Sequence, residues 1–179
     1  MTESERSVLL KTARESIQST LENRDPRYGE PPRELMRPFA LFVTLHTKGR
    51  LRGCIGTLEA SKPLFEAVKE YAIASAFRDP RFPPLGAKEL SDLSVEISVL
   101  SPLEKVQSVD EIQIGSHGLY VKQGMRSGVL LPQVAVEQRW DREQLMQNTC
   151  RKAGLPPDAW NRDDVVFYLF TAEVFGEEE

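Results

Sequence analysis

The sequence predicts an α+β fold, made mostly of antiparallel sheet with flanking helices and arranged in two lobes. Strand-like runs come in pairs joined by short turns that contain glycine, and such hairpins require antiparallel pairing. Helical patterns follow these hairpins and do not alternate with single buried strands, which argues against a doubly wound nucleotide fold. The order strand, glycine turn, strand, helix, strand occurs twice, so an internal duplication of a β-β-α-β unit is one interpretation.

Composition and charge limit the classes of function. The chain has 179 residues and a formal net charge of −4, so it can fold without disulfides and lacks the basic excess of a general nucleic-acid binder. Its first residues are polar, unlike a signal peptide, and no apolar run approaches the ~20 residues that a membrane span needs. The 2 cysteines suit a reducing cytosol, so we expect a cytoplasmic protein without membrane contact.

Motifs for cofactors and metals are missing from the sequence. It has no phosphate loop, no glycine-rich dinucleotide motif after a strand, no nucleophile elbow and no zinc-protease helix. The histidines and cysteines are scattered, without the spacing of a zinc site. We therefore expect no bound cofactor and no metal.

The first 38 residues predict a helix followed by an irregular arm. Apolar residues recur at steps of three and four through residues 4–22, and Ser4 is a suitable N-cap. Four prolines interrupt residues 23–38, where proline cannot join a regular ladder.

Two candidate halves, residues 39–100 and 114–175, follow within a single domain that spans residues 1–179. In the first half we predict strands at 39–46, 51–58 and 93–100, a helix at 63–77 and a helical turn at 87–90. In the second half we predict strands at 118–122, 128–131 and 165–175 and a helix at 141–153, capped by Asp141 and stopped by Gly154. The last three residues, all glutamate, form a tail that we expect to fray.

The two halves align without a gap under a shift of 75 residues, which places Gly49 on Gly124 and Gly53 on Gly128. Few residues are identical under this shift, and hairpin–helix–strand units are common in α+β proteins. Duplication and chance recurrence are therefore both open interpretations.

Residues 51–56, Leu-Arg-Gly-Cys-Ile-Gly, form a hexapeptide in which two glycines flank a cysteine within a predicted strand. In a regular strand Arg52, Cys54 and Gly56 share one face, and a guanidinium beside a thiol favours the thiolate. The glycines Gly53 and Gly56 let a ligand or a second backbone approach closely. The alternative is a small buried cysteine that packs where only small residues fit.

Three further polar residues are candidates for the same site. A nucleophilic cysteine usually needs a base, and of the two histidines His117, which precedes a strand, is better placed than His46. Glu96 lies on the polar face of a strand, where it is either exposed or part of the floor of a cleft. Gln133 follows a proline after an apolar run, where it orients either a loop or a ligand.

The helix at 63–77 ends in residues 78–84, which must be extended because three prolines forbid a helix there. This segment begins with residues 78–82, Arg-Asp-Pro-Arg-Phe. Two arginines around a stiff turn suggest a fixed anion contact that involves Asp79 and Arg81. The alternative is that Asp79 caps the turn while the arginines form surface ion pairs.

The hexapeptide resembles the signature of the AMMECR domain family, whose prokaryotic members are called AmmeMemoRadiSam system protein A. The resemblance continues, in order, through residues 42–45, 79–82, 95–100, 117–119, 130–133 and 152–155, and covers residues 39–175. One departure is Ser116, where the family pattern leads us to expect a basic residue before His117; this weakens an anion site at that histidine.

The resemblance implies an α+β fold with a larger and a smaller lobe and with the hexapeptide at a cleft between them. It also implies a cytosolic protein that is encoded or fused with a Memo-like protein and a radical S-adenosylmethionine (radical SAM) protein, without an established activity. The matching positions that we take as catalytic candidates are Cys54, His117 and Glu96. Those that we take as substrate-binding candidates are Arg52, Gly53, Gly56, Asp79, Arg81 and Gln133.

Two hypotheses for function follow. In the first, the chain is an enzyme or part of an enzyme system, and a cleft around Cys54 binds a small anionic or modified substrate. In the second, it is a non-catalytic module that binds a protein or an RNA segment, and the hexapeptide is structural. An accessible Cys54 favours the first hypothesis, and a cysteine sealed in the core favours the second.

Overall fold

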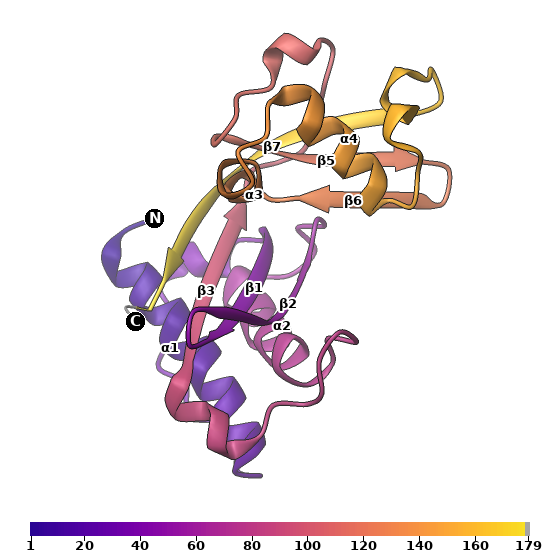
Figure 1. Ribbon diagram of the computed structural model, residues 1–179. Helices are drawn as coiled ribbons and strands as arrows, with labels where there is room; N and C mark the ends of the chain where they lie inside the picture. Colours follow the sequence, from indigo (N-terminus) through magenta and orange to yellow (C-terminus); the bar gives the residue numbers. More distant parts are fainter. Residues whose placement is uncertain (178–179) are drawn as a thin grey trace. The chain divides into compact units, whose positions relative to one another are not determined.

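The computed structural model of the chain describes residues 1–177 and confirms the predicted α+β class (Figure 1). The chain forms two compact units. Unit 1 contains Met1–Leu100 and the end of the chain from Glu173, and unit 2 contains Ser101–Ala172. The described strand pairings within each unit are antiparallel, as the hairpin pattern predicts.

The sheet of unit 1 has the strand order β2-β1-β3, and the end of β7 follows β3. These strands are β1 (Ala40–Thr47), β2 (Arg50–Thr57), β3 (Leu93–Leu100) and β7 (Val166–Gly176), which begins in unit 2. The first hairpin turns at Lys48 and Gly49, whose φ angles of 52° and 68° are those of a two-residue type I′ turn. β2 is therefore an edge strand of this sheet.

Two helices cover one face of the unit 1 sheet (Figure 1). α1 (Glu3–Leu21) packs against β3, and α2 (Leu64–Phe77) packs against β1 and β2. The apolar residues of the strands that face them, Leu41, Val43, Leu45, Val95 and Ile97, are fully or almost fully buried. Thr2 caps α1, through a capping box with Glu5, so the prediction of Ser4 as the cap is wrong.

Short helical turns link these elements. The arm at 23–38 contains η1 (Arg33–Met36), and the Leu64 N–H donates to Arg37 O at the start of α2. The turn predicted at 87–90 is η2 (Ala87–Asp92), which leads into β3.

The sheet of unit 2 has the strand order β7-β5-β6. β5 (His117–Gln123) and β6 (Arg126–Leu130) form the second hairpin, and the short β4 (Glu104–Lys105) pairs with β7. α4 (Arg142–Lys152) packs on β5 and β6, with Asp141 as its cap, as predicted. The connections contain η3 (Val109–Glu111) and η4 (Pro157–Asn161).

Two local predictions fail for clear physical reasons. Pro132, expected to end a strand, begins the short helix α3 (Pro132–Glu137), where its missing N–H costs nothing. Glu177, expected to fray, is held, because its N–H donates to Val95 O and its carboxylate accepts from the Val95 N–H and from Arg14. The other two residues of the tail lie outside the described residues.

Among residues 1–177, no helix is long and apolar enough to cross a membrane. In the same range, no cluster of three or more His, Cys, Asp and Glu side chains has a geometry that would hold a metal ion.

Candidate functional site

The hexapeptide forms most of β2, and the strand is irregular at Arg52, the second residue of the hexapeptide. Leu45 pairs with Gly53 and His46 pairs with Leu51, so Arg52 is an extra, bulged residue without a partner on β1. The regular alternation that would place Arg52 and Cys54 on one face therefore does not hold at this point.

Arg52 is directed to the segment that follows α2. Its Nε donates to Glu89 Oε1 at 2.7 Å, and its Nη2 donates to Pro83 O at 2.9 Å and to Glu89 Oε2 at 3.1 Å. The guanidinium also lies over the Phe82 ring, and only 9% of the residue is exposed. Hydrogen bonds from Arg52 lower the pKa of the Glu89 carboxyl below its usual range. Arg52 thus attaches β2 to this segment, and most of its donors are already used.

The two glycines of the hexapeptide lie against other parts of the protein. A Cβ on Gly53 would be 2.1 Å from Ser75 O in α2, and a Cβ on Gly56 would be 2.2 Å from Leu41 O and 2.5 Å from the Phe42 ring. The sequence left two reasons for these glycines, the close approach of a ligand or of a second backbone. At Gly53 the structure shows the close approach of a second backbone, that of α2.

Ser75 connects α2 to the same hairpin. Its hydroxyl accepts the Ile55 N–H at 2.9 Å and donates to Val43 O at 2.7 Å. Val43 and Ile55 are partners in the register of β1 and β2, and Ser75 is only 1% exposed. The helix therefore supplies a buried hydroxyl that bridges the two strands next to Cys54.

Cys54 lies half-buried on the sheet face opposite the helices, so it is not sealed in the core. Thr44 pairs with Cys54 on one side and with Glu96 on the other, so the three residues form a row across β2, β1 and β3. The Thr44 hydroxyl donates to Cys54 Sγ at 3.3 Å. With strands ~4.8 Å apart, Cys54 and Glu96 are separated by about 10 Å between Cα atoms. His46, two residues from Thr44 along β1, is placed on the same face.

Asp79 and Arg81 hold the main chain of Cys54. Asp79 Oδ2 accepts the Cys54 N–H at 2.9 Å, and Arg81 Nη2 donates to Cys54 O at 3.3 Å. The two side chains are themselves paired, with Arg81 Nε 3.0 Å from Asp79 Oδ1 and Nη2 2.7 Å from Oδ2. The hydrogen bonds from Arg81, and then that from the Cys54 N–H, hold the pKa of the Asp79 carboxyl well below its usual range. The Asp79 side chain is 1% exposed, whereas that of Arg81 is 49% exposed.

The two candidates in unit 2 have different surroundings. His117 Nδ1 accepts the Gln113 N–H at 3.2 Å, so a neutral ring carries its proton on Nε2 and acts there as a donor. A role as base would require this contact to break. His117 lines a pocket of about 360 Å³ that also includes Glu111 and Thr171. Gln133 lies in the first turn of α3, and its Oε1 is buried without a hydrogen-bond partner in the described part of the chain.

Seven of the nine predicted site residues belong to unit 1, and His117 and Gln133 belong to unit 2. Sequence reasoning missed three residues that contact the hexapeptide, namely Thr44, Ser75 and Glu89. The available signal was weak: Ser75 is a hydroxyl on the inward stripe of a helix, where apolar residues are expected.

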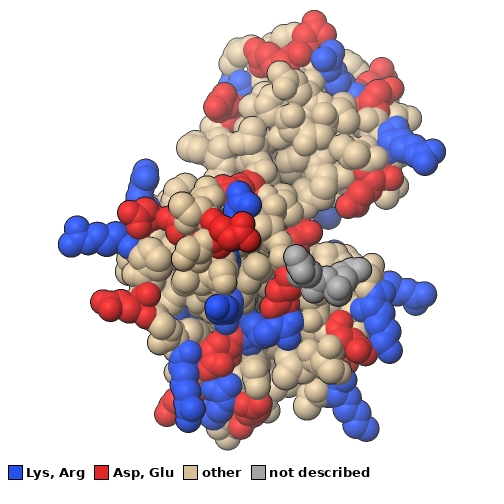
Figure 2. Space-filling view, turned by 90° about the vertical axis from the view of Figure 1, so that its left-hand side faces the viewer, with Lys and Arg blue, Asp and Glu red and all other residues tan. Residues whose placement is uncertain are grey.

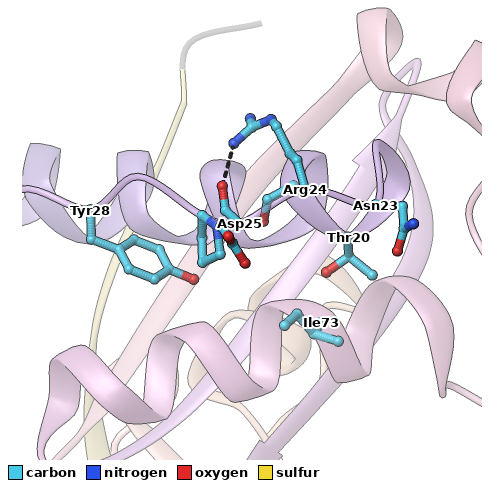
Figure 3. A pocket seen from close by; sticks show the side chains of 8 residues that line it. Thr20, Asn23, Arg24, Asp25, Tyr28 and Ile73 are labelled. Carbon is cyan, nitrogen blue, oxygen red and sulfur yellow. Dashed lines mark hydrogen bonds between the residues drawn. The ribbon is translucent and has the colours of Figure 1, made fainter.

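A separate pocket of unit 1 lies where the end of α1 meets the arm (Figure 3). Its volume is about 610 Å³, and Thr20, Tyr28 and Ile73 line it. The Arg24 guanidinium donates to Glu15, Glu22 and Asp25 O, so its charge is used to hold the arm on α1. None of the predicted site residues lines this pocket.

Fold and site together define a class: an α+β protein that presents a cysteine-containing hexapeptide on the edge strand of an antiparallel sheet. The AMMECR1 family model matches residues 10–175, so the chain belongs to the AMMECR1 family.

Relatives of the family confirm this assignment. The chain is 43% identical to Protein MK0488 of Methanopyrus kandleri over 189 residues, which cover 100% of this chain and 91% of that protein. It is 44% identical to Protein PH0010 of Pyrococcus horikoshii, over 95% of this chain and 88% of that protein. The crystal structure of the uncharacterised protein PH0010 matches with a TM-score of 0.93 and 42% identity, over 99% of this chain and 94% of that one.

Proposed function

We propose that this protein is a cytoplasmic component of an enzyme system that acts with Memo-like and radical SAM proteins. In this proposal, unit 1 binds a small anionic or modified substrate beside Cys54. The resemblance of the hexapeptide to the family signature supports the choice of partners. The arrangement of Arg81 supports the choice of substrate.

The observation that carries the proposal is the orientation of the Arg81 guanidinium. Asp79 occupies its Nε and Nη2 edge, while Nη1 makes no hydrogen bond within residues 1–177 and the side chain is half exposed. Nη2 also donates to Cys54 O at 3.3 Å, so Nη1 is the group that this guanidinium offers to an anion such as a carboxylate or phosphate. Arg52 does not offer this, because it is buried and bound to Glu89.

The side chains around Arg81 have distinct roles in this proposal. Cys54 acts as nucleophile or as a substrate contact, and the hydroxyl of Thr44, which donates to Sγ, favours the thiolate. Glu96 lies on the same sheet face and is the candidate carboxylate for proton transfer. His117, in unit 2, stays a separate candidate whose neutral ring can donate a hydrogen bond through Nε2.

Alkylation of the cysteine with two reagents tests the proposal. Iodoacetate is anionic and iodoacetamide is neutral, and otherwise they transfer similar groups. If Arg81 forms an anion contact beside Cys54, the ratio of the iodoacetate rate to the iodoacetamide rate at Cys54 should be several times higher than for a small thiol. In Arg81→Gln this ratio should fall to the value of the small thiol.

Two controls belong to this experiment. Arg50→Gln removes an exposed guanidinium from the start of the same strand and should leave the ratio unchanged. Cys150, which is fully buried, should not react in the folded protein. A Cys54 that reacts no faster than a small thiol, with a ratio that does not depend on Arg81, would contradict the proposal.

One observation favours the second candidate function, a non-catalytic module that binds a protein or an RNA segment. Gly53, Gly56 and Arg52 are all used in packing within the chain, as expected if the hexapeptide is structural.

The charges on the surface bear on the choice between a protein and an RNA partner. Basic and acidic side chains are interspersed on the face in Figure 2, without a single basic patch. For such a module Cys54→Ser should keep partner binding, and RNA affinity should fall steeply as salt increases.

A further inference from the structure

The outer edge of β2 at Cys54 is covered by side chains and not by another strand. An edge strand normally leaves every second N–H and C=O without a partner from the sheet. Here Asp79 accepts the Cys54 N–H and Arg81 donates to Cys54 O, so both main-chain groups of this residue are bound. A carboxylate and a guanidinium thus make the two contacts that one residue of an antiparallel strand would make.

The next peptide group of β2 is held from the inner side. Ile55 donates its N–H to the Ser75 hydroxyl, which also binds Val43 O on β1. Ser75 is the one serine of α2, and Asp79 and Arg81 follow this helix in a turn in which the Phe82 N–H donates to Asp79 O. The prediction that this segment is extended is therefore wrong, because a turn can also accommodate Pro80. Three residues within seven positions therefore fasten two successive peptide groups of the hexapeptide.

We propose that Ser75, Asp79 and Arg81 form an edge clamp that takes the place of a further strand beside β2, and that Ser75 and Asp79 are positioning residues for the anion contact that Arg81 makes beside Cys54. The clamp itself follows from the hydrogen bonds, whereas its positioning role depends on the proposed function. Asp79 is its centre, because it binds the Cys54 N–H and the Arg81 guanidinium at the same time.

Hydrogen exchange, measured residue by residue with NMR on the full chain, tests the clamp. In the wild type, the Cys54 N–H should exchange as slowly as amides inside the ladder, although it faces the edge of the sheet. Asp79→Ala should speed exchange at Cys54 by about tenfold or more and change Ile55 much less, because one hydrogen bond is lost locally. Ser75→Ala should produce the reverse pattern.

Thr149→Val is the matched control. Thr149 is also a buried hydroxyl on a helix that packs against a hairpin, but it donates to Leu145 O in its own helix. This variant should leave exchange at Cys54 and Ile55 unchanged. Rapid exchange of the Cys54 N–H in the wild type, or an equal acceleration at both amides in every variant, would overturn the clamp.

Asp79→Asn provides a second measurement if Asp79→Ala does not fold. An amide proton bound to a carboxylate resonates further downfield than one bound to a neutral amide, so the Cys54 proton should move upfield while Ile55 changes less. An unchanged Cys54 proton would show that Asp79 is not its acceptor in solution and would overturn the clamp.

The positioning role has its own readout in the ratio of iodoacetate to iodoacetamide rates. Asp79→Asn should lower this ratio toward that of Arg81→Gln, because the guanidinium loses its fixed orientation. If the Cys54 bond is lost in Asp79→Asn but the ratio is kept, the clamp is only structural and the positioning role is wrong. If the ratio never depends on Arg81, the proposed function fails while the exchange result stands.

Discussion

Each unit packs a helix directly onto a glycine in the return strand of its hairpin. In unit 1 a Cβ on Gly53 would be 2.1 Å from Ser75 O of α2, and in unit 2 a Cβ on Gly128 would be 2.6 Å from Ala153 N after α4. The shared glycine therefore serves helix–strand packing in both units. Its presence in the hexapeptide is not by itself a sign of a ligand.

The two units differ in the polar groups around that glycine. The return strand of unit 1 contains the bulged Arg52, and so Gly53 pairs with Leu45 in one unit while Gly128 pairs with Val121 in the other. Residues in equivalent positions of the two hairpins are therefore one position further apart in the sequence on the first strand (Leu45 and Val121) than on the return strand (Gly53 and Gly128). The alignment without a gap does not hold across the bulge, and the duplication itself stays a prediction.

The buried hydroxyls of the two helices also behave differently. The Ser75 hydroxyl makes hydrogen bonds to β1 and β2, whereas the Thr149 hydroxyl donates to a carbonyl of its own helix. The position equivalent to Cys54 under the shift of 75 residues is Val129, which has no polar side chain. The polar network is therefore an addition to a packing that both units share, and the proposed site depends on that network.

The largest expected effect is a difference in the free energy of unfolding between alanine variants at Gly53 and at Gly128. Gly53→Ala places a methyl against a helix carbonyl, so we expect it to lower the free energy of unfolding by about 3 kcal/mol or more. Gly128→Ala has more room and should cost about 1 to 3 kcal/mol. Urea denaturation measures both values. Gly29→Ala is the control, because nothing lies within 4 Å of its Cβ, and it should not destabilise. Equal costs at Gly53 and Gly128 would remove this distinction between the units.

A smaller effect, which depends on pH, should come from Asp79 in the network of unit 1. Its folded pKa lies well below the unfolded value of about 4, so its stabilising contribution is present above that pH and is lost as the pH falls further. Asp79→Asn should therefore lower the free energy of unfolding by about 1 to 3 kcal/mol at pH 7. The difference from wild type should shrink below about pH 4.

Unfolding curves at pH 7, 4 and 3 measure this dependence. Asp164→Asn is the control in unit 2, because this exposed carboxylate only accepts from Gln123, and it should change stability by less than about 0.5 kcal/mol. A difference between Asp79→Asn and wild type that grows as the pH falls would contradict the assignment.

The smallest effect concerns the two hairpin turns. In unit 1 both turn residues have positive φ, whereas in unit 2 Gly124 has a φ of 57° and the fully exposed Met125 does not have a positive φ. Lysine is not favoured at positive φ, so Lys48→Asn should stabilise unit 1 by a few tenths of a kcal/mol. Thermal unfolding measures this gain, and Met125→Asn should show none.

The elements whose signals are local could be predicted from the sequence alone. Glycine turns, alternation and helical periodicity predicted both hairpins, the long helices and the closing strands, because strand period, turn geometry and capping depend on neighbouring residues. The hexapeptide also identified Cys54, and the segment after α2 identified Asp79 and Arg81. The helix α3 was missed because a proline that ends a strand and one that begins a helix look alike over a few residues.

Contacts between groups that are distant in the sequence are known only from the folded structure. Arg52 and Glu89 are 37 residues apart, and Cys54 and Asp79 are 25 apart, so no local pattern connects them. The bulge at Arg52, the hydroxyl of Ser75 between two strands and the donation from Thr44 to the thiol depend on how α2 and its following segment pack on the hairpin. The sequence thus located Cys54, Asp79 and Arg81 but not Thr44, Ser75 and Glu89, because packing between distant segments determines which groups these residues contact.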